Sequence, residues 1–202
     1  MKVVLIDNYD SFTYILAQYL REQAGVQLTI MKNDAFVTDA LTDFDAIVIS
    51  PGPGLPSDGG HILEVIKVYS GSIPILGICL GLQAIYESFG GQLTNLSTVQ
   101  HGVTSKVSIL DPGDSLFNNV SDPFEAGRYH SWVGNPDTLP ESLRITALDQ
   151  HGNIMACRHI SHPTYGVQFH PESILTPSGR QIIHNFVGLI ANKSEEHKML
   201  KQ

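Results

Sequence analysis

The first half of the chain alternates short apolar runs with segments of helical periodicity. The runs Val3–Ile6, Ala46–Ile49 and Pro74–Ile78 are rich in branched apolar residues and contain no polar member, which is typical of strands buried on both faces. In such an alternation, each crossover helix packs on one face of a parallel sheet. The sequence therefore predicts an α/β protein with an open, mostly parallel sheet and helices on both faces.

Most of the segments between these apolar runs have the periodicity of a helix. After Ser11, a candidate N-cap, apolar residues recur at a helical spacing, and Gly25 is expected to end that helix. Two more helices are expected around Ile62–Tyr69 and over Leu80–Phe89. The segment Val26–Met31 is a further strand candidate.

The second half has a different character, with short strand candidates separated by Gly, Pro, Asn and Asp turns. This pattern favours a small antiparallel sheet joined by tight connections. The candidates are Val103–Leu110, Leu143–Asp149, Ile154–His159 and Tyr165–Phe169. A last helix is expected from Pro177 to about Ala191. The 202-residue length fits one domain, so we predict a domain over residues 1–191 and a charged tail over 192–202.

Charge and hydropathy narrow the possible partners. Twelve Lys and Arg against twenty Asp and Glu give a net charge of −8, and no basic run exists that could follow a phosphate backbone or an anionic bilayer. No stretch approaches the ~20 apolar residues of a membrane span, and the start of the chain does not resemble a secretory signal. These features predict a cytoplasmic protein that binds neither nucleic acid nor membrane, with free thiols at Cys79 and Cys157.

Cys79 lies between a predicted strand and a predicted helix, with Gly77 and Gly81 two residues away on either side. The same spacing occurs around nucleophiles at tight strand-to-helix turns, where larger neighbours would clash. The helix N-terminus would favour a thiolate, and the backbone N–H of Leu80 would point toward a developing oxyanion. We therefore interpret Cys79 as a nucleophile and Cys157 as a buried apolar residue.

His170 and Glu172 follow the last strand candidate on either side of Pro171. Proline keeps the residue before it extended, and residues two apart on an extended chain project to the same side. Glu172 could therefore hold one ring nitrogen of His170 and leave the other facing Cys79. The alternative is an ordinary strand-end turn with a surface salt pair.

Three other segments give weaker signals. The loop Pro51–Gly54 follows a buried strand at the sheet edge where α/β proteins bind ligands, and its backbone is accessible because it carries few side chains. The spacing of His159 and His162 would suit a metal, but a surface turn is favoured and no metal site is predicted. The segment Asp7–Ser11 fits either helix capping or a contact surface.

Several of these segments together resemble the triad-type (class I) glutamine amidotransferases. The resemblance is carried by Gly77–Gln83 and Gly166–Ser173 and extends from the first strand to about residue 190. Three further segments make the resemblance more specific, because they are similar to the small subunits of anthranilate synthase and aminodeoxychorismate synthase. These segments are Asp7–Thr13, Arg128–Ser131 and Ser173–Thr176. A flavodoxin-like amidotransferase fold is implied.

The resemblance also implies a role for individual residues. Cys79 would be the nucleophile, His170 the acid and base, and Glu172 the group that orients His170. Gly54 and Leu80 would supply the N–H groups of the oxyanion hole. The glutamine contacts would come from Gly52, Pro53, Gly54, Gln83, Ser131 and Trp132.

The implied reaction converts L-glutamine to glutamate and ammonia through a glutamyl thioester. The ammonia would pass to a larger, chorismate-binding synthase subunit, in a heterodimer or heterotetramer. No cofactor is expected in this subunit, whereas the larger one is expected to need Mg²⁺. Anthranilate synthesis for tryptophan is the leading expectation. The alternatives are aminodeoxychorismate synthesis for folate, or one subunit shared by both pathways.

Three positions depart from the pattern that the resemblance suggests. Leu82 replaces a common His, Val103 a frequent Lys and Trp132 a frequent Leu. The last two could alter partner contacts and the rim of the pocket. Two other functions stay open: an interaction subunit whose site has decayed, and a stand-alone cysteine hydrolase of γ-glutamyl compounds.

Overall fold

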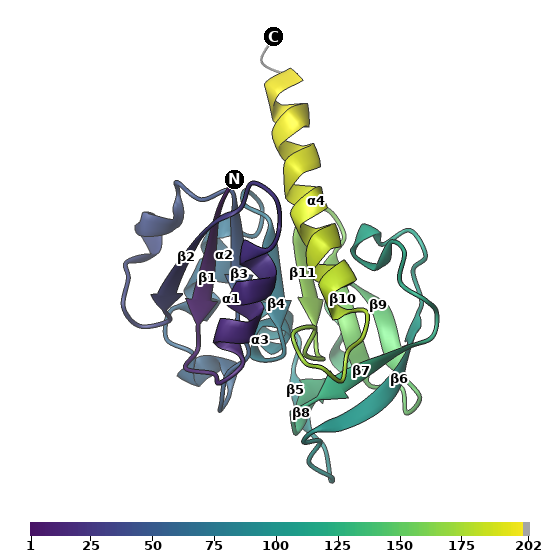
Figure 1. The fold of residues 1–202 in the computed structure, drawn as a ribbon. Coiled ribbons are helices and arrows are strands. Elements are labelled where there is room, and N and C mark those ends of the chain that lie inside the picture. Colours follow the sequence, from purple (N-terminus) through teal and green to yellow (C-terminus); the bar gives the residue numbers. More distant parts are fainter. Residues whose placement is uncertain (200–202) are drawn as a thin grey trace.

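The structure, a computed structural model, describes the backbone of residues 1–199 and the side chains of residues 1–191. Figure 1 shows the described chain. Its strands are β1 (Lys2–Asp7), β2 (Gln27–Lys32), β3 (Ala46–Ile49), β4 (Ile75–Ile78), β5 (Leu93–Asn95), β6 (Val103–Ile109), β7 (Phe124–Arg128), β8 (Trp132–Gly134), β9 (Leu143–Asp149), β10 (Ile154–His159) and β11 (Thr164–Val167). Its α-helices are α1 (Thr13–Arg21), α2 (Ile62–Tyr69), α3 (Leu80–Ser88) and α4 (Gly179–Met199).

One mixed sheet organises the described residues, in the order β2-β1-β3-β4-β11-β10-β9-β6-β7. The pairs from β2 to β11 are parallel, and those from β11 to β7 are antiparallel. The predicted antiparallel strands therefore continue the parallel sheet, and the small separate sheet is the β5–β8 pair. This arrangement confirms the predicted open α/β architecture, with β11 joining the two halves.

The helices cover both faces of the sheet, as the sequence predicts (Figure 1). Side chains of β1 alternate between two hydrophobic clusters: Val3 and Leu5 belong to one, and Val4 and Ile6 to the other. The first cluster contains residues of α1 and α4, and the second contains residues of α2 and α3. Because these strand residues are fully buried on both faces, an uninterrupted apolar run is what this position requires.

Some predicted element ends are wrong. Ser11 does not cap α1: Phe12 holds the N-cap position, and the Asp10 carboxylate accepts from the Phe12 N–H. The helix ends at Arg21, four residues before Gly25. Helix α4 begins at Gly179, where a Cβ would lie 1.7 Å from the carbonyl oxygen of Pro171, so only glycine fits this close approach.

The predicted tail, residues 192–202, is in part helical, because α4 continues to Met199 instead of ending near Ala191. Residues 200–202 and the side chains from 192 onward lie outside the described part of the chain. The sequence patterns do not predict strands β5, β7 and β8. Among the described residues, no helix combines the length and apolar character needed to cross a bilayer.

Candidate active site

Cys79 occupies the turn between β4 and α3, in a strained backbone conformation with φ 53° and ψ −100°. A Cβ on Gly77 would lie 2.4 Å from the backbone carbonyl of Gly81, and a Cβ on Gly81 would lie 2.8 Å from the carbonyl oxygen of Ile49. Both glycines therefore allow contacts that no side chain would permit. This geometry confirms the predicted tight turn, and a strained conformation of this kind is often found at functional positions.

Hydrogen bonds hold the Cys79 turn in place. The Cys79 N–H donates to the Val167 carbonyl of β11, and its carbonyl accepts from the Gln83 N–H in the first turn of α3. The side-chain amide of Gln168 lies 3.6 Å from Sγ, within reach of a weak N–H···S hydrogen bond. Cys79 is 5% exposed, so its thiol is a shielded group at a helix N-terminus.

His170 and Glu172 lie directly after β11, with His170 Nδ1 2.7 Å from Glu172 Oε1. Both side chains are buried, which excludes the alternative of a surface salt pair. Burial acts to lower the pKa of His170, but the interactions with Cys79 and Glu172 outweigh it and raise that pKa to about 10. Nε2 of His170 is buried and forms no hydrogen bond of standard geometry with the described residues, although the thiol is close enough to favour the imidazolium.

Aromatic rings fix the imidazole of His170 from two sides. The ring of Tyr129 lies with its centroid 4.8 Å away, and the ring of Phe12 meets the imidazole edge-on at 5.2 Å. The backbone N–H of His170 donates to Gly127 of β7, and its carbonyl accepts from the Thr176 hydroxyl. His170 is thus held by two distant segments, at Phe12 and at Gly127–Tyr129, and by the nearby Thr176.

A cavity of about 160 Å³, the Cys79 cavity, opens beside the thiol. It brings together all the residues predicted to contact glutamine and three that were not predicted. Its lining comprises Gly52, Pro53, Gly54, Cys79, Gln83, Val99, Tyr129, His130, Ser131 and Trp132. The unpredicted three are Val99, Tyr129 and His130; the segment Arg128–Ser131 pointed to the last two, whereas no sequence signal identified Val99.

The sequence left open whether the Asp7–Ser11 segment caps a helix or forms a contact surface. In the structure, this segment supports the Pro51–Gly54 loop. The Asn8 N–H donates to the Ser50 hydroxyl, and its side-chain amide donates to the Ser50 carbonyl. A Cβ on Gly52 would lie 2.5 Å from Cβ of Asn8. Gly54 has φ +77°, a conformation that favours glycine, and the next N–H donates to Asp58. A Cβ on Gly52 would also lie 2.8 Å from Cδ2 of Leu80, so the loop packs closely against the start of α3.

The buried residues Arg128 and His130 connect β7 to the wall of the Cys79 cavity. The Arg128 Nε–H donates to His130 Nε2, so that nitrogen is unprotonated and the proton resides on Nδ1, which donates to the Trp132 carbonyl. The same carbonyl accepts from the side-chain amide of Gln83 at 2.8 Å. Burial, together with the neighbouring Arg128 charge, lowers the pKa of His130 to about 3. His130 is therefore a neutral structural link between β7 and the cavity wall.

This neutrality predicts a pH-dependent stability difference between the wild type and the variant His130→Asn. The unfolded chain binds a proton at His130 below pH ~6.5 and the folded chain only below about 3, so the wild type loses stability as the pH falls through this window. We expect its advantage over the non-titrating variant to shrink by up to about 1.4 kcal/mol per pH unit between pH 6.5 and 3. Urea unfolding of both proteins at pH 7.5 and 5 measures this, and a constant difference would contradict it.

The weaker candidates have structural roles. Cys157 is buried, and burial raises the pKa of its thiol to about 12, as expected for an inert core residue. The rings of His159 and His162 stack at 3.8 Å and pack against Phe89. His159 is buried, so the expected surface turn is only partly correct.

The chain matches the family model for class-I glutamine amidotransferases over residues 4–189. It is 44% identical over 187 residues to the aminodeoxychorismate/anthranilate synthase component 2 of Bacillus subtilis, covering 92% of this chain and 95% of that protein. It is also 44% identical over 191 residues to the bifunctional protein TrpGD of Thermotoga maritima, covering 93% of this chain. The chain spans only 32% of the length of that second relative.

A solved structure supports the same assignment. The crystal structure of a protein described as a GMP synthase subunit, from Thermoplasma acidophilum, has a TM-score of 0.87 and 28% identity, with 98% of each chain covered. The family match, the relatives and the shared fold agree with one another. The chain therefore belongs to the class-I glutamine amidotransferase family.

Proposed function

We propose that this chain hydrolyses L-glutamine to glutamate and ammonia at Cys79 and delivers the ammonia to a larger, chorismate-aminating synthase subunit. The observation that carries this proposal is the strained Cys79 turn, which opens into a cavity and interacts with a buried His170–Glu172 pair. The names of the relatives, among them an aminodeoxychorismate/anthranilate synthase component 2, support the acceptor reaction.

In the first half of the reaction, Sγ of Cys79 attacks the side-chain carboxamide carbon of glutamine, and Nε2 of His170 takes the thiol proton. The N–H groups of Gly54 and Leu80 stabilise the oxyanion that forms. Collapse of this intermediate breaks the C–N bond. His170 returns its proton to the nitrogen, ammonia leaves, and a glutamyl thioester remains on Cys79.

In the second half, a water molecule attacks the thioester while His170 accepts a proton from it. The C–S bond breaks, the proton moves to the sulfur, and glutamate leaves. Glu172 holds Nδ1 of His170 throughout, so that Nε2 stays directed at the sulfur. The walls formed by Gln83, Ser131 and Trp132 would hold the α-amino and α-carboxylate groups of glutamine.

Exposed apolar side chains near the triad suggest where the larger subunit docks. Ile174 is 93% exposed two residues after Glu172, and Tyr14 and Ile15 are exposed on α1. Phe12, directly before α1, contacts the ring of His170, so this surface is continuous with the active site. A partner that covers it could close the site and raise its activity.

Replacing Ile174 with Asp tests this docking surface. A charge in the centre of an apolar contact is expected to weaken association with the synthase subunit at least ~5-fold, because the carboxylate would have to be desolvated. Val68→Asp is the matched control, since Val68 is an exposed apolar residue on α2, on the opposite face of the sheet. Binding is measured by calorimetry, and equal affinities for the two variants would refute the proposed surface.

The purified chain tests the function in three steps. An electrophilic glutamine analogue should label Cys79, whereas a decayed site would leave it unmodified. Ammonia release from glutamine should be slow in the isolated chain and rise when the synthase subunit is added. A rate in the isolated chain as high as in the complex would instead support a stand-alone γ-glutamyl hydrolase. Identification of the aromatic product then distinguishes anthranilate from 4-amino-4-deoxychorismate.

Three further points of the proposal concern the chain's surroundings. We propose that no cofactor acts in this subunit, that the synthase subunit requires Mg²⁺, and that the complex is cytoplasmic. Chelation of Mg²⁺ should then stop chorismate amination and leave the release of ammonia from glutamine intact.

A further inference from the structure

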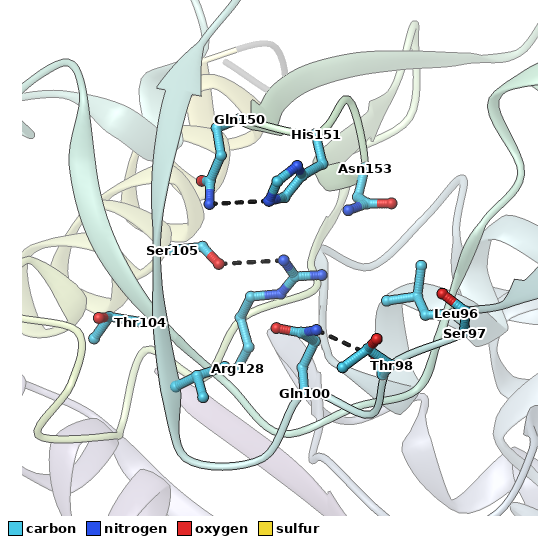
Figure 2. A pocket seen from close by; sticks show the side chains of 11 residues that line it. Leu96, Ser97, Thr98, Gln100, Thr104, Ser105, Arg128, Gln150, His151 and Asn153 are labelled. Atoms are coloured by element: carbon cyan, nitrogen blue, oxygen red, sulfur yellow. Dashed lines mark hydrogen bonds between the residues drawn. The ribbon is translucent and has the colours of Figure 1, made fainter.

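A second cavity lies beside the Cys79 cavity, and nothing in the proposed reaction uses it. This Arg128 cavity has a volume of about 450 Å³ and is shown in Figure 2. The segment between β5 and β6 contributes to both cavities: Val99 lines the Cys79 cavity, whereas Thr98 and Gln100 line the second one. Backbone hydrogen bonds from Leu96, Gln100 and Gly102 to residues 128–131 hold this segment in place.

Of the described residues, Arg128 contributes the only Lys or Arg side chain to the lining of this cavity, and no Asp or Glu lines it. Its side chain is 2% exposed. Nη1 donates to Asp149 at 2.5 Å and to the Ser105 hydroxyl at 3.2 Å, while Nε donates to His130. Nη2 is buried and has no hydrogen-bond partner among the described residues. In Figure 2 the guanidinium extends into the space between Gln150, His151 and Asn153 on one side and Gln100 and Thr98 on the other.

A buried donor without a partner destabilises the fold unless an acceptor satisfies it. The Asp149 carboxylate is not free to turn toward Nη2, because it also accepts from the backbone N–H groups of His151 and Asn153 and from the side-chain amide of Asn153. The site therefore has a fixed cation, already balanced in charge by Asp149, with the NH2 group at Nη2 left for an incoming acceptor.

The walls indicate what the rest of a ligand would look like. Hydroxyl groups come from Ser97, Thr98 and Thr104, and side-chain amides come from Gln100 and Gln150. A carboxylate is the acceptor that suits Nη2 best, since Arg–carboxylate hydrogen bonds are short and charge-assisted and their geometry matches the planar guanidinium. Hydroxyl groups on the ligand would match the polar wall. Gln150 and His151 are exposed, so their side chains can rotate to open access to Nη2.

We propose that the Arg128 cavity is a second binding site, for a small hydroxylated carboxylate whose carboxylate accepts a hydrogen bond from Nη2 of Arg128. A ligand there would contact the same side chain that holds His130, and His130 in turn binds the Trp132 carbonyl of the Cys79 cavity. The two sites are thus physically connected. Binding in the second cavity needs neither the nucleophile nor the synthase subunit.

Gluconate and sorbitol form a matched pair of probes, because both are six-carbon polyols and only gluconate carries a carboxylate. Saturation-transfer NMR on the full chain, with Cys79 alkylated to block the first cavity, should detect gluconate with a Kd on the order of 1–10 mM and no binding of sorbitol. The Nε–H signal of Arg128 should shift on titration with gluconate. Because this readout needs no activity, it does not depend on whether the proposed function is correct.

Two variants locate the site. Arg128→Lys keeps a charge beside Asp149 but loses the planar donor at Nη2, and it should weaken gluconate binding at least ~10-fold. Gln150→Leu alters an exposed wall residue and should weaken binding ~3-fold or more even if the Lys variant does not fold. Gln27→Leu, on β2 at the opposite sheet edge, is the control and should change nothing.

Several results would overturn the site. They are equal binding of gluconate and sorbitol, no detectable gluconate binding, and unchanged gluconate affinity in folded Arg128→Lys and Gln150→Leu. Loss of gluconate binding when the synthase subunit is added would also overturn it, because the cavity would then belong to the subunit interface.

Discussion

Replacing Cys79 with Ala is expected to reduce ammonia release from glutamine at least ~10⁴-fold, because no other group can form the thioester. The rest of the site should stay in place, since the strained turn is held by backbone hydrogen bonds to Val167 and Gln83. Binding of glutamine should therefore persist. The synthase complex containing the variant should still aminate chorismate when ammonium salts are added, because the loss concerns only the source of ammonia.

Cys157→Ala is the matched control for this experiment. Cys157 is also buried and also a free thiol, but it lies in β10 among apolar side chains. Its replacement should leave the turnover rate within about twofold of the wild type. The small cavity that it creates should lower the free energy of unfolding by on the order of 1 kcal/mol. If Cys79→Ala kept most of the wild-type glutaminase rate, or if Cys157→Ala abolished it, Cys79 would not be the nucleophile.

The strain at Cys79 makes a further stability comparison possible. A residue with a side chain at φ 53° and ψ −100° is strained, whereas glycine adopts positive φ without steric cost. Cys79→Gly should therefore unfold at a higher urea concentration than Cys79→Ala, by about 1 kcal/mol in free energy. Both variants lack the thiol, so this difference reports the backbone alone.

Gly77→Ala is expected to destabilise the protein by about 3 kcal/mol or more, because the added methyl group would overlap the backbone of the following helix. The added Cβ would lie 2.4 Å from the backbone C and O atoms of Gly81 and 2.8 Å from Cδ1 of Ile85. The Ile85 side chain can move, but the Gly81 backbone belongs to the first turn of α3. Strand β4 and helix α3 must therefore separate.

This separation should also move Cys79 away from His170, so the variant should lose activity even where it is still folded. Gly188→Ala is the control, because a Cβ at that position in α4 meets nothing within 4 Å, and replacing a helical glycine with alanine is stabilising by about 0.5–1 kcal/mol. Urea unfolding measures both changes. A Gly77→Ala variant as stable as the wild type would show that the turn tolerates a side chain.

The confirmed predictions depend on residues that are close to one another in the sequence. The glycines around Cys79 are required by contacts within five residues and with the adjacent strand, and the pairing of His170 with Glu172 spans two residues of an extended chain. The apolar runs of β1, β3 and β4 indicated full burial because strands covered on both faces cannot contain polar side chains. Such local steric and burial requirements can be recognised directly in the amino-acid order.

The wrongly predicted start of α1 and the strands that the sequence patterns do not indicate have a different physical origin. Ser11 is a good N-cap residue in isolation, but the chain begins α1 later because Asp7 binds Thr13 and Asp10 binds the Phe12 N–H. Strands β5 and β8 are each only three residues long, too short for a recognisable alternation. Strand β7 contains Gly127, a residue type that is depleted in strands, and Arg128, a residue type that is rarely buried unless it is paired.

The sequence by itself determined the parallel α/β core, the strained Cys79 turn and the His170–Glu172 pair, because each follows from sterics or burial over a few neighbouring residues. Only the tertiary structure placed Tyr129 and Phe12 around His170, joined Gln83 to Trp132, and buried Arg128 beside Asp149 at the floor of a second cavity. These partners lie between about 20 and 160 residues apart in the chain. Their contacts depend on the order of strands in the sheet, which is decided by the packing of the whole chain.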